Sequence, residues 1–520
     1  MRKIIALLLI IILCLLSVSC NNSSTDATND INDANDTICS ASSVDGHSDA
    51  NDDKLCDACS ISVITTFDFY AINDLHGKFT DTENTVGVEG LTTYLKTSAA
   101  LDDNPIFLSS GDMWQGGGYS NITKGKIITD WMNALGFASM TLGNHEFDWG
   151  EEYIIANEKL ASFPMLAINI YEKSTNKQVE YCQSSVMIEC NGLQVGIIGA
   201  AGDNYSSISS DKVEDVYFKT GSQLTALVKA ESQKLRNEGA DIIVYSLHDG
   251  YSQSTSDKTI SNSALSSYYD ISLSNGYVDI VFEGHTHRSY AVADSQSVYH
   301  LQNSGDNGGI SHAELEYNFA NGNYTVTQAE HIPSTKYRDL EDDAIIAEIL
   351  EKHKESVAKA DTVVGQNDIQ RDKDSLRSII AQLYFNAGNE RWGDKYDIVL
   401  GGGFMTVRSP GYLRYGILTY ADLEAILPFD NKIVLCSIKG RDLSSKFVNT
   451  SNSNYFVYYG EYGKTVRESI DYDATYYVIV DTYTALYAPN KLTIVEEYDD
   501  NVFARDLLAN HIKAGNLIVK

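Results

Sequence analysis

Five short runs of β-branched and aromatic residues each lead directly into a polar cluster, and this pattern constrains the fold more than any other feature of the sequence. The five junctions read VITTFDFYAI-NDLHGKF, PIFLSS-GDMWQGGG, FASMT-LGNHEFDWG, ADIIVYS-LHDGY and YVDIVF-EGHTHRSY. Apolar runs of this length are typical of buried strands. Segments such as GKIITDWMNALG and TGSQLTALVKAESQKLRNEG are typical of helices between them. Alternating strands and helices indicate a layered α/β domain, in which strand ends collect the functional groups.

The polar clusters contain the residue types that bind metal ions, and five of the chain's 11 histidines lie in them. Imidazole, amide and carboxylate donors suit two neighbouring divalent cations, with one carboxylate shared between them. Any single histidine here could instead be a capping or surface residue, but the ordered set favours a two-metal site. The candidate ligands are Asp74, His76, Asp112, Asn144, His248, His285 and His287.

The ordered motifs NDLHG, GDMWQGG, GNHEFD, SLHDG and GHTH resemble those of the calcineurin-like metallophosphoesterases. The longer form GNHEFDWG resembles the 5′-nucleotidase/UDP-sugar hydrolase branch of that family. The resemblance runs from Val63 to the C-terminus and is weaker beyond about residue 310. It implies an α/β protein with an N-terminal four-layer α/β/β/α metallophosphoesterase domain, a linker helix and a C-terminal α+β nucleotidase-type domain.

The resemblance also implies roles for the site residues. Two divalent ions are expected, Mn, Zn, Mg or Co, with their identity left open and with Asp112 bridging them. The first ion would be held by Asp74, His76 and His287, and the second by Asn144, His248 and His285. His145 and Asp148 would form the catalytic pair, in which Asp148 orients the imidazole and keeps it protonated. The implied reaction is attack of metal-activated hydroxide on a phosphate ester; no role is evident for Glu146.

The C-terminal region resembles the family's substrate-binding domain less closely. The segment YADLEAILPFDNKIVLCSIKGRDL contains the family's L-P-F step, so Phe429 is expected to stack on a nucleotide base; a buried core position is the alternative. Leu400 and Met405 stand where the family has Asn and Arg beside the glycine loop. The other candidates for contact with phosphate or base are Arg371, Arg377, Arg408, Tyr483 and Tyr487.

The N-terminus is typical of a secretion signal. A basic start precedes the apolar run IIALLLIIILCLL, which is short for a membrane span, and SVSC follows with small residues before Cys20. The ending resembles a bacterial lipobox and predicts an extracytoplasmic, cell-surface lipoprotein anchored to the membrane through Cys20; plain secretion is the alternative. A polar tether follows, and it contains a potential zinc site or a disulfide formed among Cys39, His47, Cys56 and Cys59. The same stretch has Asp49, Asn51, Asp53 and Asp57 at alternate positions, as in a calcium loop.

The predicted boundaries are a signal peptide at 1–19, a tether at 20–62, a catalytic domain at 63–335, a linker helix at 336–362 and a substrate-binding domain at 363–520. The linker contains DLEDDAIIAEILEKHKESVAKA, whose apolar stripe predicts one long helix. Three further cysteines are expected to be core thiols, the first two within one strand: Cys182, Cys190 and Cys436.

With 39 basic and 71 acidic residues, the chain has a formal net charge of −32, which argues against a broad grip on nucleic acid. The predicted function is release of phosphate from nucleoside monophosphates or other small phosphate esters. The alternatives are a 2′,3′-cyclic-nucleotide phosphodiesterase or a UDP-sugar pyrophosphatase of the same family and, from a different class, a substrate-binding lipoprotein. Base preference and oligomeric state stay open.

Replacing Cys20 with Ser tests the predicted anchor. Because the lipid is attached through the cysteine sulfur, the variant should lose fatty-acid labelling and should stay unprocessed or be released from the membrane fraction. Labelling of the wild type and the variant in the same cells provides the measurement. Labelling that persists in Cys20→Ser contradicts the lipobox prediction.

Overall fold

The computed structural model describes residues 49–51, 54–55, 62–81, 86–97, 105–252, 258–403, 407–408, 410–443, 457–459, 470–487, 492–498 and 502–517. The predicted signal peptide and Cys20 lie outside the described residues, as do Cys39, His47, Cys56, Cys59 and Met405. Within the described part of the chain, no helix is both long and apolar enough to span a bilayer.

Two six-stranded sheets form the centre of the catalytic domain. The first has the order β14(Asn323–Pro333), β13(Gly309–Asn318), β1(Ile64–Ile72), β2(Ile106–Ser109), β3(Ser139–Thr141), β4(Met165–Leu166). The second has the order β11(Tyr290–Ala293), β12(Tyr299–Gln302), β10(Ile280–Glu283), β9(Ile242–Leu247), β7(Leu193–Ala200), β6(Ser185–Cys190). A short ribbon pairs β5(Ile170–Glu172) with β8(Val216–Phe218).

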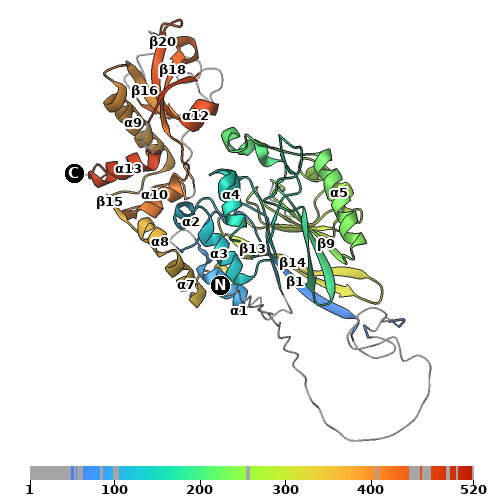
Figure 1. The fold of residues 1–520 in the computed structure, drawn as a ribbon. Helices are drawn as coiled ribbons and strands as arrows, with labels where there is room; N and C mark the ends of the chain where they lie inside the picture. The colour runs from blue at the N-terminus through green and yellow to red at the C-terminus, as the bar shows by residue number, and fades with distance from the viewer. Residues whose placement is uncertain are drawn as a thin grey trace, which may run out of the picture.

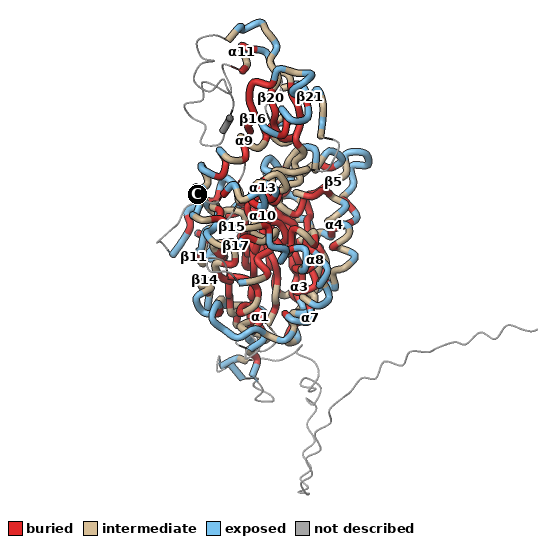
Figure 2. The backbone as a smooth tube through the Cα atoms, turned by 90° about the vertical axis from the view of Figure 1, so that its left-hand side faces the viewer, coloured by how far each residue is buried: buried red, intermediate tan, exposed pale blue. Residues whose placement is uncertain are grey.

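The two sheets face each other across an apolar core that includes Phe69, Leu108, Val195, Val244 and Phe282. Helices cover both outer faces. The first sheet packs against α1(Val88–Thr97), α3(Lys126–Leu135) and α4(Glu151–Glu158), and the second packs against α5(Ser222–Asn237). The short helices α2(Gly118–Thr123) and α6(Asn262–Leu265) complete this domain. The predicted four-layer α/β/β/α arrangement is therefore confirmed, and Figure 2 shows its buried residues concentrated along the sheets.

The central strands of each sheet run parallel, which determines where their ends lie. Strands β1 to β4 are paired in parallel, and so are β7, β9, β10 and β12. In parallel sheets the carboxyl ends share one edge. Because the two sheets are stacked, the loops that follow β1, β2, β3, β9 and β10 meet above one end of the sandwich.

The linker contains two helices instead of the single helix expected from its apolar stripe. Helix α7 (Ala344–Lys352) ends at His353, where φ is −104° and ψ is 17°, and α8 (Lys354–Ala360) begins directly after it. His353 Nε2 lies 2.8 Å from Asp130 on α3. The break between the two helices thus coincides with a long-range contact to the catalytic domain. The hydrophobic periodicity of the sequence did not indicate this break.

The C-terminal domain contains a five-stranded mixed sheet of order β19(Val457–Tyr459), β16(Ile398–Gly403), β20(Thr475–Asp481), β18(Ile433–Lys439), β21(Leu492–Glu497). A second ribbon pairs β15(Val363–Asn367) with β17(Gly416–Thr419). The helices are α9(Lys373–Trp392), α10(Tyr420–Ile426), α11(Gly440–Asp442), α12(Thr482–Tyr487) and α13(Ala504–Lys513). Figure 1 shows this domain, orange to red, at one end of the catalytic domain, and α10 contacts α2 across the junction.

The three cysteines expected in the core are buried. Cys190 ends β6 and Cys436 lies in β18, but Cys182 lies outside β6, which begins at Ser185. The expectation that Cys182 and Cys190 share one strand was therefore wrong. The antiparallel backbone pairing with β7 starts only at Ser185, which leaves Cys182 in the preceding loop.

Candidate active site

Every predicted metal ligand lies directly beyond a strand end. Asp74 and His76 follow β1, Asp112 follows β2 and Asn144 follows β3. His248 follows β9, and His285 and His287 follow β10. The first four residues come from one sheet and the last three from the other, so the cluster exists only when both sheets are packed together.

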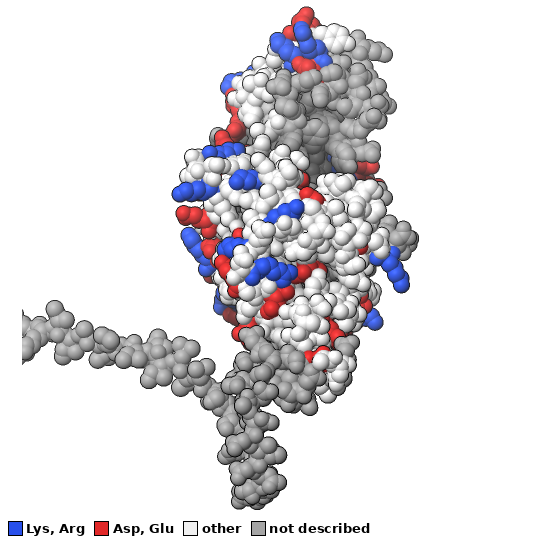
Figure 3. All heavy atoms as spheres, turned by 90° about the vertical axis from the view of Figure 1, so that its right-hand side faces the viewer, with Lys and Arg blue, Asp and Glu red and all other residues white. Residues whose placement is uncertain are grey.

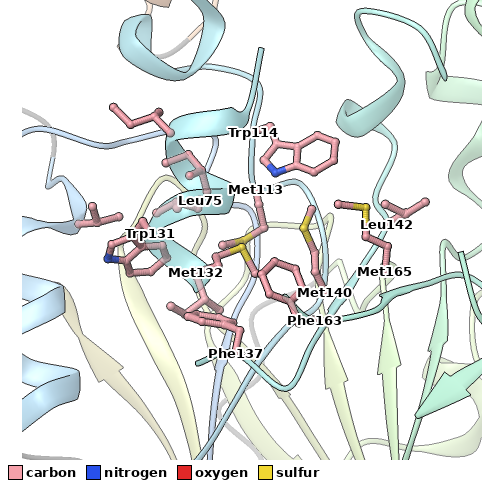
Figure 4. Close-up of a cluster of buried hydrophobic side chains, with 14 of the residues drawn as sticks. Leu75, Met113, Trp114, Trp131, Met132, Phe137, Met140, Leu142, Phe163 and Met165 are labelled. Atoms are coloured by element: carbon pink, nitrogen blue, oxygen red, sulfur yellow. The ribbon is translucent and has the colours of Figure 1, made fainter. Parts of the chain in front are cut away.

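Apolar residues next to the candidate ligands anchor their loops in the core. Leu75, Met113, Trp114 and Leu142 are all fully buried, and Figure 4 shows their side chains in one apolar cluster. Burial of each such side chain contributes about 1.5–3 kcal/mol. The polar residue beside each anchor is thereby held in a fixed direction.

Five of the seven candidate ligands have a left-handed backbone, with φ between 49° and 70°: Asp74, His76, Asp112, His285 and His287. Such values are uncommon outside glycine and cost roughly 1–3 kcal/mol each unless the surroundings enforce them. The loops also approach each other closely, since a Cβ at Gly143 would lie 2.3 Å from Asp112 Oδ1. The chain is thus locally strained where the ligands converge.

The first group of ligands consists of Asp74, His76 and His287. Asp74 Oδ1 lies 3.1 Å from His287 Nε2 and 3.9 Å from His76 Nε2, and the two Nε2 atoms are 3.1 Å apart. His76 Nδ1 lies 2.9 Å from the Gln115 carbonyl oxygen. Because a carbonyl oxygen only accepts, the His76 proton is on Nδ1 and the Nε2 lone pair points at the other two ligands.

The second group consists of Asp112, His248 and His285, with Asn144 beside it. His248 Nε2 lies 3.1 Å from Asp112 Oδ2 and 3.2 Å from Asn144 Oδ1. Asn144 Oδ1 is also 2.9 Å from His285 Nδ1. His248 Nδ1 donates to the Ser110 carbonyl oxygen over 2.7 Å, so its Nε2 faces two oxygens that are themselves acceptors.

The chemistry of both groups fits a cation. Ligands of one small dication stand about 3–3.5 Å from each other, which is close to the separations measured here. Asp74 Oδ1 is buried and accepts no well-formed hydrogen bond. Although burial raises it, the pKa of Asp74 is held at about 2 by His287. Burial and then the Arg408 guanidinium lower the pKa of His76 to about 3, so both offer free lone pairs at neutral pH.

His248 behaves differently. Burial lowers its pKa, but the Asp112 carboxylate outweighs burial and raises the pKa to about 10. In the absence of a cation, a proton on Nε2 therefore neutralises Asp112. A metal ion bound at this position would have to displace that proton, which makes metal affinity increase with pH.

His145 and Asp148 form the pair expected from the sequence motif. His145 Nδ1 lies 2.6 Å from Asp148 Oδ2, and the His145 backbone N–H donates to Asp112 Oδ1 over 2.7 Å. Burial lowers the pKa of His145, but the Asp148 carboxylate reverses this and raises it above the usual value. With Nδ1 engaged by Asp148, Nε2 is the nitrogen left for a partner in the cavity.

Glu146, for which the sequence suggested no role, joins two ligand loops. Its buried carboxylate accepts backbone N–H groups from Gly143 at 2.7 Å, Asp112 at 2.9 Å and Met113 at 2.8 Å. These bonds connect the loop after β2 to the loop after β3. A carboxylate beside Phe147 in the GNHEFDWG motif was the available signal, but its partners Asp112 and Met113 lie more than 30 residues upstream.

A cavity of about 580 Å³ connects this cluster to the C-terminal domain. Its size lies within the range typical of ligand sites. The catalytic domain contributes Asp112, Asn144, His145, Asp148, His285 and His287, and the C-terminal domain contributes Arg408, Phe429 and Tyr483. Asn431 also lines the cavity and was not expected from the sequence.

Two of the predicted arginines do not line this cavity. Arg371 donates to Asn367 Oδ1 and to the Leu517 carbonyl oxygen, at 3.2 Å each. Arg377 is buried on α9, and its Nη1 lies 3.4 Å from Asp374. Each is engaged within the C-terminal domain, and the role of both in substrate binding stays a prediction. The side chain of Tyr487 lies outside the described residues.

The comparisons with known proteins identify the family that the catalytic domain resembles. Residues 67–289 match the family model described as calcineurin-like phosphoesterase. Every candidate metal ligand and the pair His145 and Asp148 fall inside that range. The chain thus contains a calcineurin-like phosphoesterase domain over these residues, and phosphoesterases of this kind use divalent metal ions.

Within that class the chain is a phosphoric ester hydrolase of the 5′-nucleotidase type. It is 25% identical over 426 residues to protein UshA of Yersinia enterocolitica, covering 73% of this chain and 75% of that protein. It is also 25% identical to a 5′-nucleotidase of Diplobatis ommata, covering 72% of this chain and 69% of that one. In fold it resembles the 5′-nucleotidase precursor from Thermus thermophilus, with a TM-score of 0.66, 18% identity and coverage of 88% and 97%.

Replacing Glu146 with Gln tests its role in joining the loops. The amide keeps the shape but puts N–H donors against backbone N–H groups, which should cost roughly 1–3 kcal/mol for each donor left unpaired. We expect lower stability in chemical denaturation and roughly 10–100-fold weaker metal binding. Glu152→Gln, at an exposed position on α4, is the matched control. If the two variants behave alike, Glu146 does not hold the ligand loops.

Proposed function

We propose that this protein is an extracytoplasmic two-metal phosphohydrolase that releases phosphate from nucleoside monophosphates. The observation that carries the proposal is the single cavity in which two groups of metal-type ligands, the His145–Asp148 pair and two aromatic side chains meet. A phosphate ester of an alcohol that carries an aromatic ring system, such as a nucleoside, matches this combination, since one end of the cavity suits an anion and the other suits a ring.

The phosphoryl group would lie at the catalytic-domain end of the cavity. Asp74, His76 and His287 would hold one divalent ion and Asn144, His248 and His285 the other, with Asp112 between them. When bound, two such ions activate a water molecule as nucleophile and neutralise charge on the phosphoryl oxygens. His145 would donate through Nε2 to a phosphoryl or leaving oxygen, while Asp148 keeps the imidazole oriented and protonated.

The nucleoside would lie at the C-terminal end of the cavity. Phe429 and Tyr483 line it from different segments and offer two ring faces to a base. Arg408 lines the same cavity and offers a guanidinium to the phosphate. Support for a nucleotide substrate also comes from the relatives, which include 5′-nucleotidases and an apyrase of Tabanus yao that is 25% identical over 72% of this chain.

Location and domain limits belong to the same proposal. The signal peptide and the lipid anchor at Cys20 rest on the N-terminal sequence alone. The domain limits at 63–335, 336–362 and 363–520 follow the change from the layered sheets to the linker helices and the mixed sheet. Nucleic acid is not an expected ligand: on the face drawn in Figure 3, acidic and basic side chains are interspersed.

Phosphate release from a panel of mononucleotides, cyclic nucleotides and nucleotide-sugars, with metal added or chelated, tests the function. We expect release from mononucleotides that depends on added Mn or Zn. His145→Ala should lower turnover roughly 10²–10⁴-fold. Its metal content should be unchanged, because the backbone N–H bond to Asp112 does not need the side chain.

Asp148→Asn is the control. It should lower turnover less than His145→Ala does, because the imidazole stays in place. Elemental analysis should find close to two ions per chain in the wild type and in both variants. Loss of metal from His145→Ala would reassign His145 as a ligand. Activity without bound metal would overturn the proposed mechanism.

Replacing Phe429 with Ala tests the base-binding end. Loss of one stacked ring costs about 1–3 kcal/mol, so the KM for nucleotides should rise while that for an aryl phosphate changes little. Since stacking accepts any base, AMP, GMP and UMP should differ less than about tenfold in kcat/KM, a spread of 1.4 kcal/mol. Tyr483→Ala should act in the same direction. An equal rise in KM for the nucleotide and the aryl phosphate would contradict the stacking role of Phe429.

A further inference from the structure

A second, smaller cavity lies beside the first group of candidate ligands. It has a volume of about 220 Å³, several times the roughly 30 Å³ that a water molecule occupies in the liquid. His76 and His287 form part of its wall, and its charged lining consists of Lys78, Asp306, Lys373 and Arg408. His287 and Arg408 also line the large cavity, so the two cavities are neighbours.

The lining is positively charged. Lys78, Lys373 and Arg408 contribute three cations, and Asp306 contributes the one carboxylate of this side pocket. Lys78 is only 5% exposed, and its Nζ lies 3.4 Å from Asp306 Oδ1. Among the described residues, Lys373 and Arg408 form no ion pair with a carboxylate. The side pocket thus carries an excess of positive charge, although the net charge of the chain is −32.

The cations come from both domains. Lys78 follows β1 in the catalytic domain, and Lys373 begins α9 in the C-terminal domain. The Arg408 Nη2 atom lies 3.4 Å from His76 Nδ1, and this nitrogen already donates to the Gln115 carbonyl oxygen. Burial, and then Arg377 and Arg408, lower the pKa of Lys373, which shows that neighbouring cations repel it. An anion between the cations would relieve that repulsion.

We infer that the side pocket binds a second tetrahedral oxyanion next to the reacting phosphoryl group. Lys78, Lys373 and Arg408 supply ammonium and guanidinium donors of the type that bind phosphate oxygens. The oxyanion is either inorganic phosphate or a further phosphate group of the substrate. This inference rests on the proposed function for the neighbouring position, but not on which nucleotide is hydrolysed.

Equilibrium dialysis of inorganic phosphate against the Mn-loaded protein tests the pocket. The wild type should bind close to two phosphates per chain. Lys373→Gln should bind one tightly and the second roughly tenfold more weakly or not at all. Lys177→Gln, which removes an exposed lysine, is the charge-matched control and should retain two. Lys78→Met provides a second variant that removes a different donor from the pocket.

The source of the oxyanion is resolved by kinetics on AMP and ADP. If the pocket takes a substrate group, Lys373→Gln should lower kcat/KM for ADP relative to AMP. If it takes released phosphate, the variant should lose product inhibition and keep the ADP-to-AMP ratio. One phosphate per chain in the wild type, or unchanged binding in both lysine variants, overturns the inference. Absence of phosphate release from any nucleotide would instead overturn the proposed function.

Discussion

The packing of the two sheets against each other is the interaction on which the rest of the protein depends. Side chains such as Phe69 and Phe282, whose rings are 5.8 Å apart, join the sheets face to face. Only this contact brings the strand ends of both sheets to one edge. Asp112 and His248, from different sheets, then stand 3.1 Å apart. Apolar burial, which has no direction of its own, thereby fixes the positions of highly directional metal ligands.

Much of the catalytic domain could be predicted because its signals are local. An apolar run followed by Asp74 and His76, or by Asn144 and His145, contains both the strand and its polar end within about ten residues. Parallel strands then place such ends together. The fold class and the convergence of the ligands followed from this reasoning and from the family resemblance.

The features that could not be predicted depend on contacts between distant segments. Glu146 acquires its role from backbone groups of another loop, and the break at His353 coincides with a contact to Asp130. Arg371 and Arg377 occupy plausible sequence positions, but their side chains are engaged within their own domain. Lys373 faces the catalytic site only because the two domains pack together. Neither hydrophobic periodicity nor motif spacing predicts contacts between segments that are far apart in the sequence.

The left-handed backbone of five candidate ligands has a consequence for how the protein can change. Each of these residues holds a conformation that glycine adopts without penalty. A substitution to glycine at Asp112 or His285 would remove a ligand and local strain together, so loss of activity need not bring loss of stability. At these positions selection for stability favours glycine, whereas selection for catalysis favours the metal-binding side chain. Folded but inactive forms are therefore only one substitution away from the active enzyme.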